Sequence, residues 1–162
     1  MENAFTGEKK TPAAVRSPAG DKVASITRDA WRELGFWYDC DVAGKRWTFR
    51  ADRRGVAALA AEVQRFLESP ESAITGEHTH LGPYSNLRFI AAERPQISWR
   101  GLAGRREDFA RLAAELDAIA QASGDGVRTI GAGFEGADGF SAVIAVECDG
   151  FDPASAESAI EA

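Results

Sequence analysis

The sequence predicts an α+β fold in which two pseudo-repeated β-α-β-β units form a largely antiparallel sheet with two helices on one face. An apolar stripe with helical spacing appears twice, since residues 59–63 (LAAEV) recur 53 positions later as residues 112–116 (LAAEL). A tryptophan precedes each stripe and β-rich segments follow each stripe. The repeat therefore spans about residues 46–93 and 97–147, and the pattern leaves open whether the two units share one sheet or stack as two.

Composition indicates a single domain. The 162 residues are 44% hydrophobic and 27% charged, which suits one ordinary core over residues 24–153. Residues 1–23 are rich in Lys, Pro, Gly, Ala and Ser, so we predict a disordered N-terminal tail there and a C-terminal tail at residues 154–162. No run approaches the roughly 18 apolar residues of a membrane helix, and the N-terminus lacks the apolar block of a secretory signal. We therefore expect a cytoplasmic protein without membrane contact.

A short helix and a hairpin are expected before the repeat. Thr27 is placed to cap a helix that runs through Trp31 and stops at the next glycine. Aromatic extended chain follows at residues 36–38, and a turn at residues 43–45 joins it to a strand at residues 46–50.

The helices and strands of the repeat follow from periodicity and breaker residues. Asp52 is a suitable N-cap for the first helix, which should end near Pro70 because proline cannot continue a helix. The other predicted elements are strands 77–81 and 86–90 in the first unit, and strand 96–99, helix 105–120 and strands 127–130 and 141–146 in the second.

Net charge favours a protein partner over a nucleic acid. The formal net charge is -6 and the pI is near 5.0, whereas phosphate binding needs clustered Lys and Arg. An acidic surface suits a basic protein partner, although such charge is commonly present only for solubility. We expect a protein partner, no nucleic acid, and a monomer or homodimer.

The glycine-rich segment at residues 131–136 (GAGFEG) matches the dinucleotide-binding fingerprint formally. That site needs a helix directly after the glycines, whose N-terminal amides meet the pyrophosphate. A β-rich run follows instead, so we interpret the glycines as a turn and expect no cofactor.

His78 and His80 are the only histidines. On a strand their side chains project from the same face, a spacing that can chelate a metal if Asp, Glu or Cys supplies further ligands. This supports an alternative function as a small metal-binding enzyme or sensor. The favoured interpretation is a structural pair that is hydrogen-bonded near the turn at Gly82 and Pro83.

Catalytic signatures are weak. Cys40 and Cys148 each lie between acidic residues, which should raise the pKa of both thiols and make them poor nucleophiles. A disulfide between them is left open. Four carboxylates would form a paired site only if the outer strands meet, and there is no Gly-x-Ser-x-Gly elbow. We expect no catalytic residues and favour a non-enzymatic role; the four carboxylates are Asp39, Asp41, Asp149 and Asp152.

The tryptophans fall into two groups according to whether they occupy equivalent positions in the repeat. Trp47 and Trp99 occupy equivalent places, which predicts core packing for both. Trp31, Trp37 and Tyr84 lie outside the repeated pattern or in a loop, so they are freer to form a recognition surface.

Residues 76–84 (GEHTHLGPY), followed by the strand at 86–90 and a Trp-led second unit, resemble small bacterial α+β proteins grouped with toxin-immunity families. The resemblance covers about residues 44–153. It implies a non-enzymatic binding protein, and specifically an immunity protein that neutralises a bacterial toxin domain. The residues that we predict to contact the partner are Trp37, Glu77, His78, His80 and Tyr84.

Overall fold

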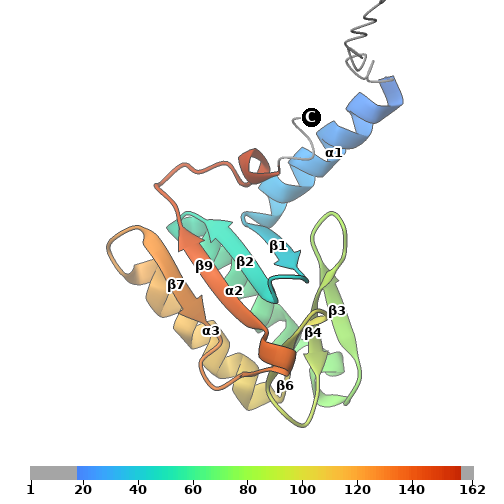
Figure 1. Ribbon diagram of the computed structural model, residues 1–162, viewed down its shortest axis with the longest axis vertical. Helices are drawn as coiled ribbons and strands as arrows, with labels where there is room; N and C mark the ends of the chain where they lie inside the picture. Colours follow the sequence, from blue (N-terminus) through green and yellow to red (C-terminus); the bar gives the residue numbers. More distant parts are fainter. Residues whose placement is uncertain (1–17, 158–162) are drawn as a thin grey trace, which may run out of the picture.

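The computed structural model describes residues 18–157 and has an α+β fold, as predicted (Figure 1). The described residues form three α-helices and two mostly antiparallel sheets. The helices are α1 (Pro18–Leu34), α2 (Arg53–Glu68) and α3 (Arg106–Gln121). The four-stranded sheet has the order β1 (Trp37–Asp41), β2 (Arg46–Ala51), β9 (Ser141–Val146) and β7 (Gly126–Ile130).

The five-stranded sheet and the short 3-10 helices complete the fold. The order of this sheet is β3 (His78–Leu81), β4 (Leu87–Ala91), β6 (Gly101–Gly104), β5 (Gln96–Ser98) and β8 (Glu135–Gly136). The 3-10 helices are η1 (Pro70–Ala73), η2 (Ala137–Gly139) and η3 (Pro153–Ala156).

The strands form two sheets, a choice that the sequence pattern left open. β2 pairs with β9 in parallel and β4 pairs with β6 in parallel, while the neighbouring pairs within each hairpin are antiparallel. Each sheet therefore joins a hairpin from the first half of the chain to a hairpin from the second. Helix α2 carries the chain from one sheet to the other, and α3 carries it back. The residue-level repeat itself stays a prediction.

Strand β6 was not predicted because its sequence, Gly-Leu-Ala-Gly, has little β propensity. Gly101 has a φ of +131°, and a Cβ atom there would lie 2.2 Å from the carbonyl oxygen of Arg88. The glycine therefore permits the close approach of β6 to β4 that forms the middle of the five-stranded sheet.

The core lies between the α2–α3 helix pair and the inner faces of the sheets. Figure 1 shows both helices behind the four-stranded sheet. Phe66 of α2 packs 5.0 Å from Phe109 of α3 and 6.1 Å from Phe89 of β4, measured between ring centroids. All three rings are buried. This aromatic contact fixes the five-stranded sheet against the helices.

Both ends of the described chain are more ordered than the predicted tails. Helix α1 begins at Pro18, so residues 18–23 belong to it; residues 1–17 lie outside the described part. At the other end, η3 buries Ala154, and Asp152 forms an ion pair of 3.0 Å with Arg32 of α1. Residues 158–162 lie outside the described part. None of the helices in residues 18–157 is long and apolar enough to cross a membrane.

Candidate functional site

The two histidines form a hydrogen-bonded pair on the outer face of β3. Their Nε2 atoms lie 3.0 Å apart, and Nδ1 of His80 lies 2.7 Å from the carbonyl oxygen of Ser85. Because a carbonyl can only accept, His80 donates to Ser85 through Nδ1–H, and Nδ1 of His78 lies 3.4 Å from the Gly76 carbonyl oxygen. This geometry agrees with a structural pair that ties β3 to the following loop.

A metal site at His78 and His80 would need further ligands, and residues 18–157 place none beside the pair. No group of three or more His, Cys, Asp or Glu side chains there could hold a metal ion. A protein site for zinc normally takes at least three protein ligands. The pair alone does not supply that number, and metal binding by His78 and His80 stays a prediction.

A row of outward-facing residues crosses the five-stranded sheet beside this pair. His80 lies opposite Arg88, Arg88 lies opposite Gly101, and Gly101 lies opposite Ser98. Directly opposed residues project from the same face of a sheet. The alternating burial of β4 places Phe89 toward the core, so Arg88 and the rest of the row face away from the helices.

Two connections leave the same end of this sheet. They are the β3–β4 loop at residues 82–86 and the β5–β6 turn formed by Trp99 and Arg100, and the register of Arg88 with Gly101 places their strands side by side. We refer to this region as the Arg88–Trp99 surface, which comprises His78, His80, Arg88, Trp99 and Arg100.

Trp99 is 55% exposed, so its predicted place in the core is wrong. It falls in the turn before β6, whereas Trp47 lies on the inner face of β2 and is fully buried. The turn is nevertheless well fixed. The carbonyl oxygen of Ser98 accepts the Trp47 indole N–H at 2.7 Å, and the Ser98 hydroxyl accepts the Arg100 N–H at 3.2 Å. The Arg100 guanidinium lies 5.3 Å from the Trp99 ring centroid.

Tyr84 and Trp37 both pack on Trp31, at ring-centroid separations of 6.1 Å and 6.4 Å. Trp31 is fully buried, so our prediction that it is freer to form a recognition surface is wrong. Its burial depends on residues from distant segments, including Glu157, which accepts its indole N–H at 3.3 Å. Tyr84 is 55% exposed, and its contact with Trp31 holds the β3–β4 loop against α1.

The predicted partner-binding residues are divided between two places. Glu77, His78 and His80 are exposed on or next to β3, and Tyr84 follows in the loop. Trp37 is half-buried on the other sheet, where it lies opposite Arg50. Glu77, His78 and His80 therefore lie together on or next to β3, whereas Tyr84 and Trp37 both contact Trp31.

The two arginines of the Arg88–Trp99 surface have no ion-pair partner in residues 18–157. Six other arginines there have a carboxylate oxygen within 4.0 Å, and six more, like Arg88 and Arg100, do not. Sequence analysis did not identify these two. The strand pattern around Arg88 could have shown that it faces outward, but not that it lacks an ion-pair partner.

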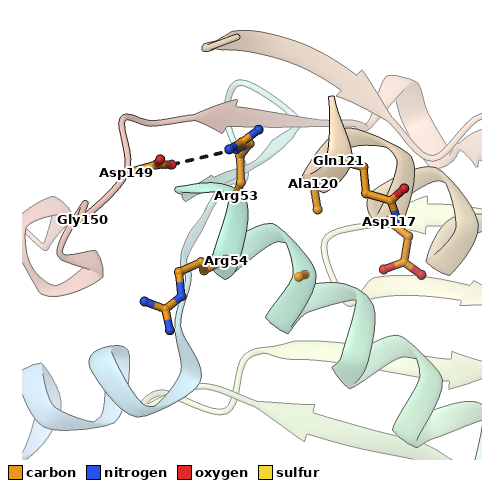
Figure 2. Close-up of a pocket in the computed structure, with 8 residues that line it drawn as sticks. Arg53, Arg54, Asp117, Ala120, Gln121, Asp149 and Gly150 are labelled. Carbon is orange, nitrogen blue, oxygen red and sulfur yellow. Dashed lines mark ion pairs between the residues drawn. The ribbon is translucent and has the colours of Figure 1, made fainter. Parts of the chain in front are cut away.

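An open cavity of about 670 Å³ lies elsewhere, beside the start of α2 and the end of α3 (Figure 2). Arg53 and Asp149 form an ion pair of 3.9 Å across it, and Asp117 and Gln121 line it from α3. Figure 2 shows Arg54 pointing away from that pair. The lining contains no Ser, Cys or His nucleophile, and none of the predicted partner-contact residues lies there.

The cysteines are free thiols, so the disulfide is absent. Burial first, and then Asp39 and Asp41, raise the pKa of Cys40 to about 11. A hydrogen bond to Asp125 is the main cause that raises the pKa of Cys148. Both directions agree with the prediction of poorly reactive thiols.

The four candidate carboxylates do not converge. Asp149 pairs with Arg53 at the start of α2, and Asp152 pairs with Arg32 of α1. Asp39 and Asp41 lie on β1, the edge strand of the four-stranded sheet.

The glycine-rich segment is a turn, as predicted. Gly131 and Gly133 have φ values of +81° and +87°, and the Phe134 N–H donates to the Gly131 carbonyl at 3.0 Å. The chain continues into β8, so the helix N-terminus that a pyrophosphate needs does not follow.

Comparison with family models, curated proteins and solved structures gives no match. The resemblance to toxin-immunity families therefore stays a prediction.

Proposed function

We propose that this protein is a non-enzymatic protein-binding protein that contacts its partner through the Arg88–Trp99 surface and the adjoining β3–β4 loop. The supporting observation is Trp99, a tryptophan that is more than half exposed in a turn held by hydrogen bonds. Trp, Tyr and Arg are the residue types that most often dominate the binding energy of an interface. This surface and the loop beside it contain all three.

Preorganisation also supports a binding role. The Ser98 contacts fix the β5–β6 turn, and the His80 contact with the Ser85 carbonyl fixes the β3–β4 loop. Side chains and loops that are ordered before association lower the entropy cost of binding. A partner would therefore meet aromatic and guanidinium groups that are already positioned.

The specific form that we propose is an immunity protein that neutralises a bacterial toxin domain. The support is the resemblance at residues 76–84, which comprise β3 and the start of the loop beside the Arg88–Trp99 surface. Such a protein acts by occlusion, so it needs an exposed, preordered surface and no catalytic groups.

Affinity capture from native cells tests the proposal with three forms of the tagged protein: wild type, Trp99→Ala and Val127→Ala. Val127 is the matched control because it is a 71% exposed apolar residue on β7 of the other sheet. We expect a stoichiometric protein partner with wild type and Val127→Ala. The Kd between the captured partner and the protein should rise about 30-fold or more when Trp99→Ala replaces wild type, the effect typical of a hot spot. A partner that binds Trp99→Ala as tightly as wild type contradicts the proposal.

A further inference from the structure

We infer that the partner presents carboxylate groups to the Arg88–Trp99 surface, where Arg88 and Arg100 bind them. This inference rests on the proposed function and specifies the chemistry of the partner. The chain pairs other arginines with its own acidic residues, as Arg50 with Glu147 at 2.9 Å. Arg88 and Arg100 have no such partner in residues 18–157, as is also true of six other arginines there. These two lie on the same surface as the exposed Trp99, so that surface carries positive charge that the described part of the chain does not neutralise.

The position of Arg88 suits a carboxylate ligand. It lies opposite Gly101, so no side chain stands between Arg88 and Ser98 in that row of the sheet. On its other side lies His80, whose Nδ1–H is already used by the Ser85 carbonyl. A guanidinium group presents paired N–H donors in a fixed plane that matches the two oxygens of a carboxylate.

Arg100 adds a second donor group at the end of the sheet. Its guanidinium lies 5.3 Å from the centroid of the Trp99 ring, a distance typical of a cation–π contact. Contact with the ring limits the positions of the guanidinium and leaves N–H groups along its edge for hydrogen bonding. Trp99 supplies the apolar area next to these charged groups.

The location of charge revises the sequence-based expectation of a basic partner. The net charge of -6 belongs to the whole chain, whereas this surface carries two arginines without acidic partners. Affinity for the phosphates of a nucleic acid needs many clustered Lys and Arg side chains, whereas two arginines are enough to bind a small number of carboxylates. An acidic protein partner is therefore favoured over a nucleic acid.

Fluorescence anisotropy with fluorescein-labelled poly-L-glutamate tests the inference on the full-length protein. We expect saturable binding that weakens as salt is added, because exposed charge interactions are screened. Arg88→Gln and Arg100→Gln should each weaken binding about 10-fold, which corresponds to about 1.4 kcal/mol, because each removes a charge-assisted hydrogen bond. Arg88→Lys should restore only part of the affinity, because lysine lacks the planar donor pair.

Arg94→Gln is the matched control. Arg94 is an exposed arginine in the β4–β5 connection, at the opposite end of the same sheet. The inference fails if poly-L-glutamate does not bind, or if Arg94→Gln weakens binding as much as the other two substitutions. It also fails if labelled oligo(dT) binds more tightly with the same dependence on Arg88 and Arg100, because the surface would then bind nucleic acid.

Failure of this inference is distinguishable from failure of the proposed function. If poly-L-glutamate does not bind while Trp99→Ala still releases the captured partner, protein binding stands and carboxylate recognition is wrong. If Trp99→Ala retains the captured partner as tightly as wild type does, the proposed function fails.

Discussion

Two outward-facing arginines on inner strands, Arg50 of β2 and Arg88 of β4, have opposite surroundings. On the four-stranded sheet, Arg50 of β2 pairs with Glu147, and its guanidinium lies 5.1 Å from the ring centroid of Phe151. Both partners come from the segment that follows β9. On the five-stranded sheet, Arg88 of β4 has no carboxylate within 4.0 Å among residues 18–157. The segment after β9 neutralises Arg50, whereas within residues 18–157 neither Arg46 on the same strand nor Arg88 has a carboxylate partner. We propose that Arg88 meets its carboxylate on another molecule.

The largest expected effect separates the two tryptophans. Trp47 is fully buried and donates to the Ser98 carbonyl, so Trp47→Ala should reduce the free energy of unfolding by about 3–5 kcal/mol. Trp99 is 55% exposed, and Trp99→Ala should cost about 1 kcal/mol or less. Urea denaturation followed by circular dichroism measures both. Equal losses would mean that Trp99 is a core residue and not a binding residue.

The next effect concerns Asp108, a fully buried carboxylate on α3. It accepts the Arg105 backbone N–H at 2.8 Å and pairs with the guanidinium groups of Arg105 and Arg111. Asp108→Asn keeps the shape but loses the charge, so we expect a loss of about 2 kcal/mol in urea denaturation. Glu107→Gln, one residue away and exposed, is the control and should change stability little.

The same carboxyl makes stability depend on pH. Burial alone would raise the pKa of Asp108, but the Arg105 backbone N–H and the two guanidinium groups outweigh it, and the pKa is lowered. A pKa lowered by folding stabilises the folded state above the unfolded value, near 3.9, and this contribution is lost as the pH falls toward the folded value. The gap between wild type and Asp108→Asn should therefore narrow below about pH 4. A gap that stays constant down to about pH 3 would contradict this assignment.

A smaller effect is expected from Glu147→Gln, which removes the counter-charge of Arg50. Both side chains are about one-third exposed, so solvent weakens the pair and the loss should be about 0.5–1 kcal/mol. The substitution also leaves Arg50, like Arg46 on the same strand, without a carboxylate partner in residues 18–157. If poly-L-glutamate binds the four-stranded sheet of Glu147→Gln as tightly as it binds the five-stranded sheet, the missing counter-charge alone determines where an acidic ligand binds.

The smallest effect on stability is expected at Arg88 and Arg100. Because neither is ion-paired within the described residues, Arg88→Gln and Arg100→Gln should change the free energy of unfolding by about 0.5 kcal/mol or less. Thermal and urea unfolding check this. A loss above about 1 kcal/mol would assign these arginines a structural role and would weaken the contrast between the two faces.

Local patterns predicted α2 and α3 well, but the predicted N-cap of the first helix is wrong. Thr27 lies inside α1, where its hydroxyl donates to the Val23 carbonyl at 3.0 Å. The apolar stripe of α2 is buried, and Asp52 accepts the Gly55 N–H at 2.9 Å as its N-cap. Helix α3 lies one residue from its predicted bounds at each end. These features depend on neighbouring residues alone, since periodicity and capping act within a few positions of the chain.

Long-range contacts limited the rest of the fold prediction. The parallel pairing of β2 with β9 joins residue 46 to residue 141, and the glycines of β6 gave no strand signal. The repeat predicts a core position for Trp99 because it is equivalent to Trp47. In the structure Trp99 lies in the turn before β6, where it is exposed.

The site was predictable only in part. Alternation along a strand correctly placed His78 and His80 together, since residues two apart share a face. Whether Arg88 is ion-paired depends on where distant acidic residues lie, and a sequence pattern does not contain that information. The same holds for Trp31, which is buried by contacts from β1, the β3–β4 loop and Glu157.

The most direct test of the central claim is an NMR titration of the ¹⁵N-labelled full-length protein with poly-L-glutamate. We predict that the largest shift changes occur at the backbone amides of His80, Arg88, Arg100 and Gly101 and at the indole N–H of Trp99. Shift changes centred on Arg53 and Arg54, or equal changes around Arg50 on the other sheet, would contradict the account.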